Sequence, residues 1–229
     1  MILQKALAVG LGVLAWSWAA PSQPWLQSFA VDVKELATQG ESPYFVLKPG
    51  YQTTFVGKES GKRGKLVITV LNETRTIGGV DTRVVEEREW SGDEVIEVSR
   101  NFFAIHPATG DVYYFGEDVD MYKKGKLVNH EGSWQHGTNG ARFGLMMPGK
   151  PAVGMRFYQE LARGVAMDRA EIVSLSERLT TPAGVFEKCL KTKETTPLEI
   201  LAREYKVYAP GIGLIKDGAL ELVSHQFVR

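Results

Sequence analysis

Three β-rich runs in the middle of the chain decide the fold: VDTRVVEEREW (residues 80–90), EVIEVSRNFFAI (94–105) and VYYFGEDVDMY (112–122). Short turn sequences, Ser91-Gly92-Asp93 and Pro107-Ala108-Thr109-Gly110, separate them. Runs rich in β-branched and aromatic residues, divided by such turns, are typical of strands joined by hairpins. The stretch therefore predicts consecutive antiparallel strands, longer than the usual ~5–6 residues, as in a curved sheet or barrel.

The same alternation of strands and turns extends outward from this stretch. Turn sequences recur about every dozen residues, the spacing expected of hairpin-connected strands. No linker rich in Pro, Gly or Ser divides the chain, so residues 44–229 are predicted to form one mainly β domain. We expect a single strongly curved antiparallel sheet or a β-barrel. The further predicted strands cover residues 66–71, 127–134, 155–162, 166–175, 177–181, 185–193 and 199–208, with a last strand leading toward residue 223.

Residues 20–43 form an N-terminal segment with a different pattern. Phe29, Val33, Leu36 and Ala37 recur at nearly helical spacing, and Gly40 is placed to end a helix. The segment therefore predicts a short N-terminal helix over residues 29–39.

Residues 1–19 have the order of a secretory signal peptide. Lys5 precedes an apolar run over residues 6–16, and Ser17-Trp18-Ala19 offers a small-x-small cleavage site. The run is shorter than the ~20 residues that span a bilayer, which disfavours the alternative of an uncleaved anchor. We expect an exported protein, periplasmic or secreted, with no membrane span after processing.

The composition is that of an ordinary globular protein. The 229 residues include 27 Lys and Arg and 27 Asp and Glu, with 44% hydrophobic and 24% charged residues. This composition excludes a disordered chain, and the balanced charge gives no reason to expect a nucleic-acid partner. Cys189 is the single cysteine, so a disulfide scaffold is excluded and a buried structural thiol is expected.

The hairpin after residue 111 predicts an acidic strand face. If the chain turns at Lys124-Gly125, then Asp118 lies opposite Glu131 and Asp120 lies opposite Asn129. Like charges directly opposite one another destabilise a sheet, and carboxylate and amide oxygens suit Ca²⁺. These four residues are the candidate metal ligands. An exposed acidic face surrounded by lysines is the alternative, because no dedicated calcium-loop spacing is present.

A glycine-rich segment, residues 137–154, interrupts the strand pattern and has the apolar sequence FGLMMP at residues 143–148. We expect a long loop here that packs over something, as a plug at the end of the sheet or as a lid over a ligand. Pockets are mostly apolar and aromatic, although the same side chains would serve equally well in a filled core. The candidate lining residues are Trp90, Phe102, Phe115, Trp134, Phe143, Met146, Met147 and Phe157.

Sequence motifs for catalysis are missing from the chain. It contains no Gly-x-Ser-x-Gly, no phosphate-binding loop and no dinucleotide fingerprint, and His130 and His136 are not four residues apart as a zinc protease helix requires. We therefore name no catalytic residue, favour a protein that is not an enzyme, and expect no cofactor other than Ca²⁺.

Three segments carry a family resemblance: residues 44–50 (YFVLKPG), 181–186 (TPAGVF) and 208–216 (YAPGIGLIK). They resemble recurrent pieces of the TapB-like group of exported bacterial proteins, in that order and across most of the chain after Tyr44. The resemblance implies a strongly bent antiparallel sheet or barrel, similar to the lipoprotein-carrier half-barrels. It identifies a scaffold, not an activity, and supplies no catalytic residues.

Together these patterns predict an exported, non-enzymatic binding protein that holds an apolar or amphipathic small molecule in a curved sheet or barrel. Two alternatives stay open. One is a Ca²⁺-dependent protein or hydrolase that uses the acidic hairpin face, and the other is an interaction module of the cell envelope.

Overall fold

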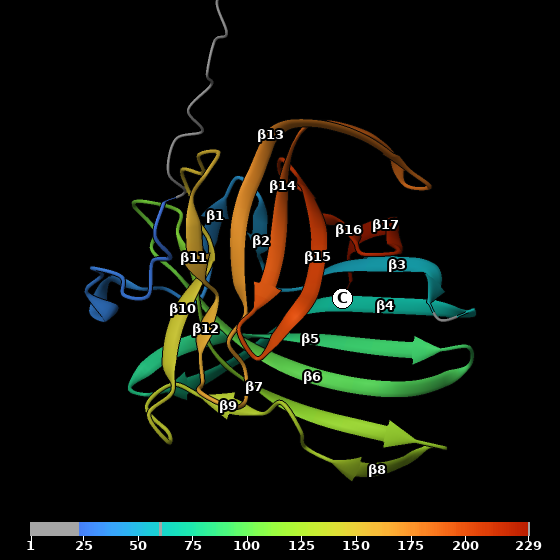
Figure 1. The fold of residues 1–229 in the computed structure, drawn as a ribbon, viewed down its shortest axis with the longest axis horizontal. Helices are drawn as coiled ribbons and strands as arrows, with labels where there is room; N and C mark the ends of the chain where they lie inside the picture. The colour runs from blue at the N-terminus through green and yellow to red at the C-terminus, as the bar shows by residue number, and fades with distance from the viewer. Residues whose placement is uncertain (1–22, 60, 229) are drawn as a thin grey trace, which may run out of the picture.

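The computed structural model describes residues 23–59 and 61–228, which form a mainly β fold (Figure 1). A 3₁₀ helix, η1 (Val33–Glu35), and a small hairpin of β1 (Gly40–Ser42) and β2 (Phe45–Leu47) come first. The long strands of the main sheet are β3 (Tyr51–Glu59), β4 (Lys62–Ile77), β5 (Val80–Ser91), β6 (Glu94–Ile105), β7 (Val112–Lys123), β13 (Arg169–Thr181), β14 (Gly184–Thr196), β15 (Glu199–Ala209) and β17 (Leu220–Phe227). Shorter strands are β8 (Lys126–Asn129), β9 (Trp134–Gln135), β10 (Arg142–Met147), β11 (Arg156–Tyr158), β12 (Glu160–Leu161) and β16 (Gly213–Asp217).

The central hairpins predicted from the sequence are confirmed. Strands β4, β5, β6 and β7 pair antiparallel in chain order. The turn between β4 and β5 is the pair Gly78 and Gly79, both with positive φ, at 57° and 85°. Two-residue hairpin turns favour residues with positive φ, which glycine adopts without steric cost. The turn sequence thus fixes where β4 ends and β5 begins.

All of the main-sheet strands belong to one antiparallel sheet of 15 strands. Its order runs from β11 through β13–β17 to β3, then through β4–β7 to β10 and β12. The first and last long strands meet in the middle, where Tyr51 of β3 pairs with Phe227 of β17. In Figure 1, β13–β15 run across the direction of β3–β7. One half of the sheet therefore packs over a face of the other half.

The two ends of the sheet are neighbours in the chain. Strand β11 pairs with β13 at one end, β12 pairs with β10 at the other, and only Gln159 separates β11 from β12. Within residues 23–59 and 61–228, no hydrogen-bonded ladder joins the two ends, so the sheet is open there. The prediction of a mainly β fold with a large antiparallel sheet is confirmed, but the prediction of a strongly curved sheet or closed barrel is wrong.

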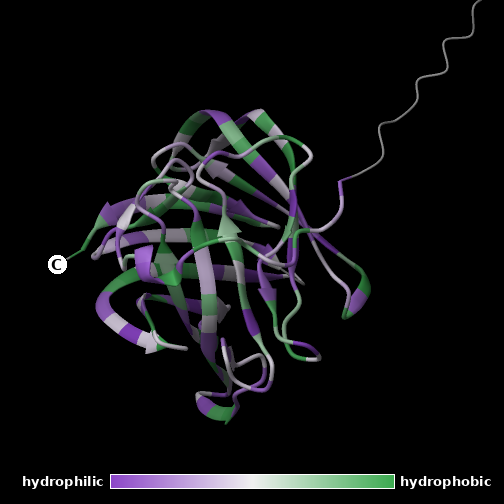
Figure 2. Ribbon diagram, turned by 90° about the vertical axis from the view of Figure 1, so that its left-hand side faces the viewer, coloured by the Kyte–Doolittle hydropathy of each residue, from purple (hydrophilic) through white to green (hydrophobic). Residues whose placement is uncertain are grey.

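The two faces of β3–β7 differ in character. The inner face carries the row of directly paired residues Thr53, Ile68, Glu87 and Ser99, and the outer face carries the row Glu86, Arg100 and Asp118. Figure 2 shows the result as narrow bands of alternating hydropathy along the strands. This alternation is typical of strands with one buried face.

Two clusters of apolar side chains form the core. The larger one packs Phe102, Phe103, Phe115, Phe157 and Ile172 with their neighbours. The smaller one surrounds Cys189 with residues of β3, β4 and β15–β17. Cys189 is fully buried, and burial raises the pKa of its thiol, so the expectation of a buried cysteine is confirmed.

The predicted helix over residues 29–39 is wrong, because only Val33–Glu35 is helical, in a single 3₁₀ turn. The rest of this segment is held against the sheet. Ala37 exchanges two backbone hydrogen bonds with Ile105, of 2.8 and 2.9 Å, and Phe29 packs against Tyr113. These tertiary contacts override the weak helical spacing. The signal peptide predicted for residues 1–19 lies outside the described residues.

The segment over residues 137–154 is also not the predicted long loop. Its centre forms β10, which pairs with β7 on one side and β12 on the other. The apolar sequence at residues 143–148 is therefore mostly a strand of the main sheet. In the part of the chain that the structure describes, no helix has the length and apolar character needed to cross a membrane.

Candidate functional site

A cavity of about 90 Å³ lies between the inner face of β3–β6 and strands β15 and β16. The cavity lies where β13–β15 cross over β3–β7, at a place where the side chains of the two halves do not fill the space between them. The wall is mainly apolar, with a charged region contributed by β5, β15 and β16. The lining residues are Phe45, Val46, Tyr51, Thr53, Ile68, Val70, Val85, Glu87, Phe103, Met146, Lys206, Tyr208, Ile212, Gly213, Leu214 and Asp217.

The β1–β2 hairpin covers the apolar end of the cavity. Phe45 of β2 packs edge-on against Phe103, with ring centroids 5.1 Å apart. The hairpin is fastened by two hydrogen bonds to other elements: the Tyr44 hydroxyl donates to the Lys188 carbonyl at 3.0 Å, and the Gly211 N–H donates to the Pro43 carbonyl at 2.8 Å. Leu47 of β2 is also fully buried in the core, so a small but packed element closes this end.

An ion-paired lysine marks the polar end. The Lys206 ammonium lies 3.2 Å from the Asp217 carboxylate and 3.6 Å from that of Glu194. Burial alone would lower the pKa of Lys206, but Asp217 and Glu194 outweigh burial and raise the pKa well above its usual value. Lys206 therefore stays charged, with two carboxylates as its counter-ions.

Glu87 is the second feature of the polar end. Among the described residues, its carboxyl group makes no hydrogen bond and no ion pair within 4 Å, although it lines the cavity. Burial raises the pKa of Glu87 to about 8, against the opposing effect of Lys206. At neutral pH this side chain is therefore mainly a neutral carboxylic acid.

More carboxyl groups extend from Glu87 along the interior. Burial raises the pKa of Glu117 to about 7 and that of Glu160 well above its usual value. Burial also raises the pKa of Glu194 and of Asp168, whose backbone N–H donates to Glu160 Oε1 at 2.5 Å. The interior thus holds more acidic than basic groups, and protonation relieves their repulsion.

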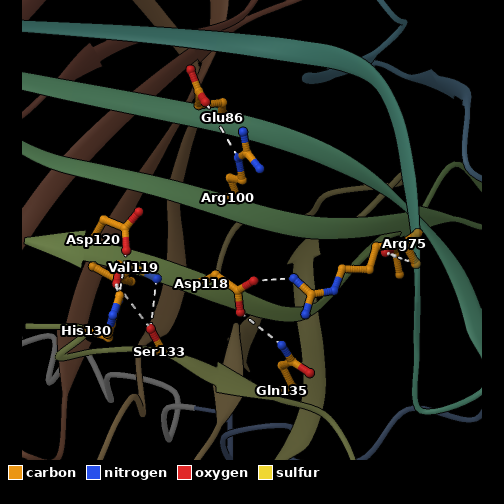
Figure 3. A network of polar contacts seen from close by, with 10 residues as sticks. Arg75, Glu86, Arg100, Asp118, Val119, Asp120, His130, Ser133 and Gln135 are labelled. Atoms are coloured by element: carbon orange, nitrogen blue, oxygen red, sulfur yellow. Dashed lines mark hydrogen bonds and ion pairs between the residues drawn. The ribbon is translucent and has the colours of Figure 1, made fainter.

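Asp118 and Asp120 of the predicted acidic hairpin lie on the outer face, away from the cavity, and each contacts a basic or amide side chain (Figure 3). Arg75 of β4 forms an ion pair with Asp118, which also accepts a hydrogen bond of 2.9 Å from the Gln135 side chain. Asp120 lies 2.8 Å from His130 Nδ1. The Arg75 guanidinium thus compensates the negative charge of Asp118.

The predicted hairpin register holds only beside the turn. Lys123 pairs with Lys126 as expected, but Met121 pairs with Asn129 and Glu117 pairs with Trp134, so the register shifts twice. The chain between β8 and β9 turns, and the Ser133 hydroxyl there accepts a hydrogen bond of 2.8 Å from the Val119 N–H. The predicted oppositions of Asp118 with Glu131 and of Asp120 with Asn129 are therefore wrong.

The four candidate metal ligands make different contacts in the structure. Asn129 accepts a hydrogen bond of 3.1 Å from the Glu131 N–H, and both residues are exposed. Over residues 23–59 and 61–228, no group of three or more His, Cys, Asp or Glu side chains is placed to hold a metal ion. The Ca²⁺ site stays a prediction.

Of the predicted ligand-lining residues, Met146 lines the cavity. Phe115 stacks on Phe143 at 4.8 Å, and Trp134 packs edge-on against Tyr114 at 5.3 Å, so these three rings fill the core. The remaining residues also lie elsewhere: Phe102, Met147 and Phe157 are almost fully buried, and the Lys65 ammonium lies 4.5 Å above the Trp90 ring.

The residues that define the polar end were not selected from the sequence. Glu87 lies in a run of charged residues, 86–89, in which acids fall on both faces of β5 and the one base, Arg88, falls on the outer face. Lys206 and Asp217 lie on either side of the segment 208–216 that carries the family resemblance, and no catalytic or binding motif includes them. Tyr51, Thr53 and Phe55 of β3 are buried at alternate positions and identify the inner face to which these groups point.

Comparisons with known proteins identify no relative: no family model, curated protein or solved structure matches this chain. The resemblance to the TapB-like group therefore stays a prediction.

Proposed function

We propose that this protein binds a small amphipathic molecule in the cavity between β3–β6 and β15–β16. The observation that carries the proposal is the division of the cavity wall. Aromatic and aliphatic side chains surround one end, and Glu87, Lys206 and Asp217 gather at the other. Pockets that bind small molecules typically combine an apolar wall with a few polar groups that fix the orientation of the ligand.

The size of the cavity limits the ligand. At about 90 Å³ it is smaller than the roughly 300–1,000 Å³ typical of pockets for drug-sized molecules. A short alkyl or aromatic compound fits without rearrangement. A longer chain requires displacement of Met146, whose unbranched side chain adapts easily, or of the β1–β2 hairpin.

The proposal is for a binding protein, and export stays part of it as a prediction. A carrier or sensor needs a ligand site and a route into it, and we propose that the ligand enters beside the small β1–β2 hairpin that covers the apolar end. The acidic outer face supports the alternative of a Ca²⁺-dependent protein less well, because the carboxylates of Asp118 and Asp120 already have partners.

A substitution that fills the cavity tests this proposal. Leu214 lines it and is half-buried, so Leu214→Phe should occupy the space. Leu175→Phe is the matched control, because Leu175 is also half-buried against the same core but does not line the cavity. Saturation-transfer NMR would measure binding of hexylamine, 1-hexanol and hexanoate. We expect at least one to bind the wild type and Leu175→Phe but not Leu214→Phe. Equal binding by all three proteins, or no binding at all, would refute the proposal.

A further inference from the structure

The charged groups at the polar end of the cavity indicate the chemistry of the ligand's head group. Among the described residues that line the cavity, Lys206 carries the one amine, and both of its close neighbours are carboxylates. A ligand carboxylate or phosphate would have to compete with Asp217 and Glu194 for this amine. An anionic head group is therefore disfavoured.

Glu87 has the opposite character, because it faces the cavity without a hydrogen bond or ion pair from the described residues. A carboxyl group left without a partner in a desolvated site costs free energy, which a ligand with a complementary charge recovers. Ile68 of β4 and Ser99 of β6, the strand partners of Glu87, carry no charge. The titratable groups that face Glu87 are acidic except for Lys206, and they are Glu89 of β5, Tyr114 and Glu117 of β7, Lys206 and Tyr208 of β15, and Asp217 of β16.

We propose that the ligand carries a cationic amine as its head group, which pairs with Glu87 at the polar end while its apolar body fills the space under the β1–β2 hairpin. This inference rests on the proposed function and adds the class of ligand, an alkyl- or arylalkyl-ammonium ion. With Glu87 ionised, the carboxylates of Glu87, Asp217 and Glu194 outnumber the Lys206 ammonium. One further cation therefore improves the charge balance of the site.

The pairing requires the loss of one proton. Glu87 is mainly protonated below about pH 8, whereas an alkylammonium ion, like a lysine side chain, stays charged to about pH 10. Binding at pH 7 thus releases the Glu87 proton to solvent, and the new ion pair forms between the carboxylate and the ammonium group. The affinity should rise about tenfold per pH unit between pH 6 and pH 8 and level off above.

The experiment compares hexylamine, 1-hexanol and hexanoate, which share one apolar chain, by NMR titration at pH 6, 7 and 8. We expect hexylamine to bind at least tenfold more tightly than the other two at pH 8, and to lose affinity as the pH falls. In Glu87→Gln this preference and the pH dependence should disappear, while 1-hexanol still binds. Glu86→Gln, on the outer face of the same strand, is the matched control and should behave as the wild type.

The outcomes separate the two proposals. If 1-hexanol or hexanoate binds as tightly as hexylamine and Leu214→Phe abolishes that binding, the cavity is a ligand site but the amine is the wrong head group. If Glu87→Gln keeps the preference for hexylamine, Glu87 is not its partner and the inference fails. If no hexyl compound binds, the proposed function fails with it.

Discussion

Gly144 lies directly against the backbone of Gln159, so closely that a Cβ atom on Gly144 would stand 2.3 Å from the Gln159 carbonyl oxygen and 2.4 Å from its carbon. The contact joins β10 to the residue that separates β11 from β12, where the two ends of the sheet are neighbours in the chain. Gly144 does not have a positive φ, so space and not backbone conformation requires glycine here.

Gly144→Ala should therefore destabilise the protein by about 1–3 kcal/mol, since a main-chain group cannot move aside as a flexible side chain can. Urea denaturation measures the change. Arg142→Ala, at an exposed position of the same strand, is the control and should change the free energy of unfolding by less than about 0.5 kcal/mol. Similar effects of the two substitutions would contradict the close contact.

Stability should fall as the pH rises from 4.5 to 8. The pKa of Glu87 is about 8 in the folded protein and near its ordinary 4.5 in the unfolded chain, so between these values the folded protein binds more protons. Glu117, with a pKa of about 7 in the folded protein, also lowers the stability as the pH rises toward 7. We expect Glu87→Gln to be roughly 1–3 kcal/mol more stable than the wild type at pH 8 and similar to it at pH 4.5.

Urea denaturation at pH 4.5, 6 and 8 would show this difference, with Glu86→Gln as the control. Glu86 lies on the outer face beside Arg88 and Arg100 and should keep the slope of the wild type. Parallel stability curves for the wild type and Glu87→Gln would show that Glu87 is not buried as described.

Lys206→Met should destabilise the fold by about 3 kcal/mol, because it leaves Asp217 and Glu194 without a counter-charge in a partly buried site. Adding Asp217→Asn should restore part of the loss. Lys216→Met removes the more exposed ion pair with Glu221 and should cost less than about 1 kcal/mol. Thermal melting of the wild type and these three variants would test this order, and equal losses for both lysines would contradict it.

Asp118→Asn distinguishes the two interpretations of the acidic outer face. The ion pair with Arg75 is about half exposed, so we expect a small loss of roughly 0.2–1 kcal/mol with or without Ca²⁺. Melting curves in Ca²⁺ and in chelator would show whether the ion matters. A melting temperature that depends on Ca²⁺ in the wild type but not in Asp118→Asn would favour the cation site instead.

Local sequence signals predicted much of the sheet. The runs that became β5, β6 and β7 are bounded by turns whose glycines have positive φ, and the pairing of sequence neighbours follows from the short connections. The strand β10 was missed because the glycines and prolines of the surrounding segment, residues 137–154, resemble those of a loop. The expected barrel also failed, because local patterns do not determine whether the two ends of a sheet pair with each other.

The candidate site was harder to predict, because it depends on contacts between distant segments. Glu87 and Lys206 approach only after β15 packs over β5, and nothing in their local sequences requires this. The hairpin register failed for a related reason, since the hydrogen bond from Val119 to Ser133 replaces the regular pairing beyond the turn. Side-chain hydrogen bonds of this kind compete with the strand ladder and shift it.

The pairing of β3 with β17 has a consequence for the order of folding. Each of the hairpins from β4 to β7 can form as soon as its own residues are available, but β3 gains its second neighbour only when the chain has reached Phe227. Contacts between residues so far apart in sequence close large loops, and proteins dominated by such contacts fold slowly. We therefore expect the inner face of β3–β6 to stay exposed to solvent until β15–β17 have been synthesised. The cavity should then form late in folding.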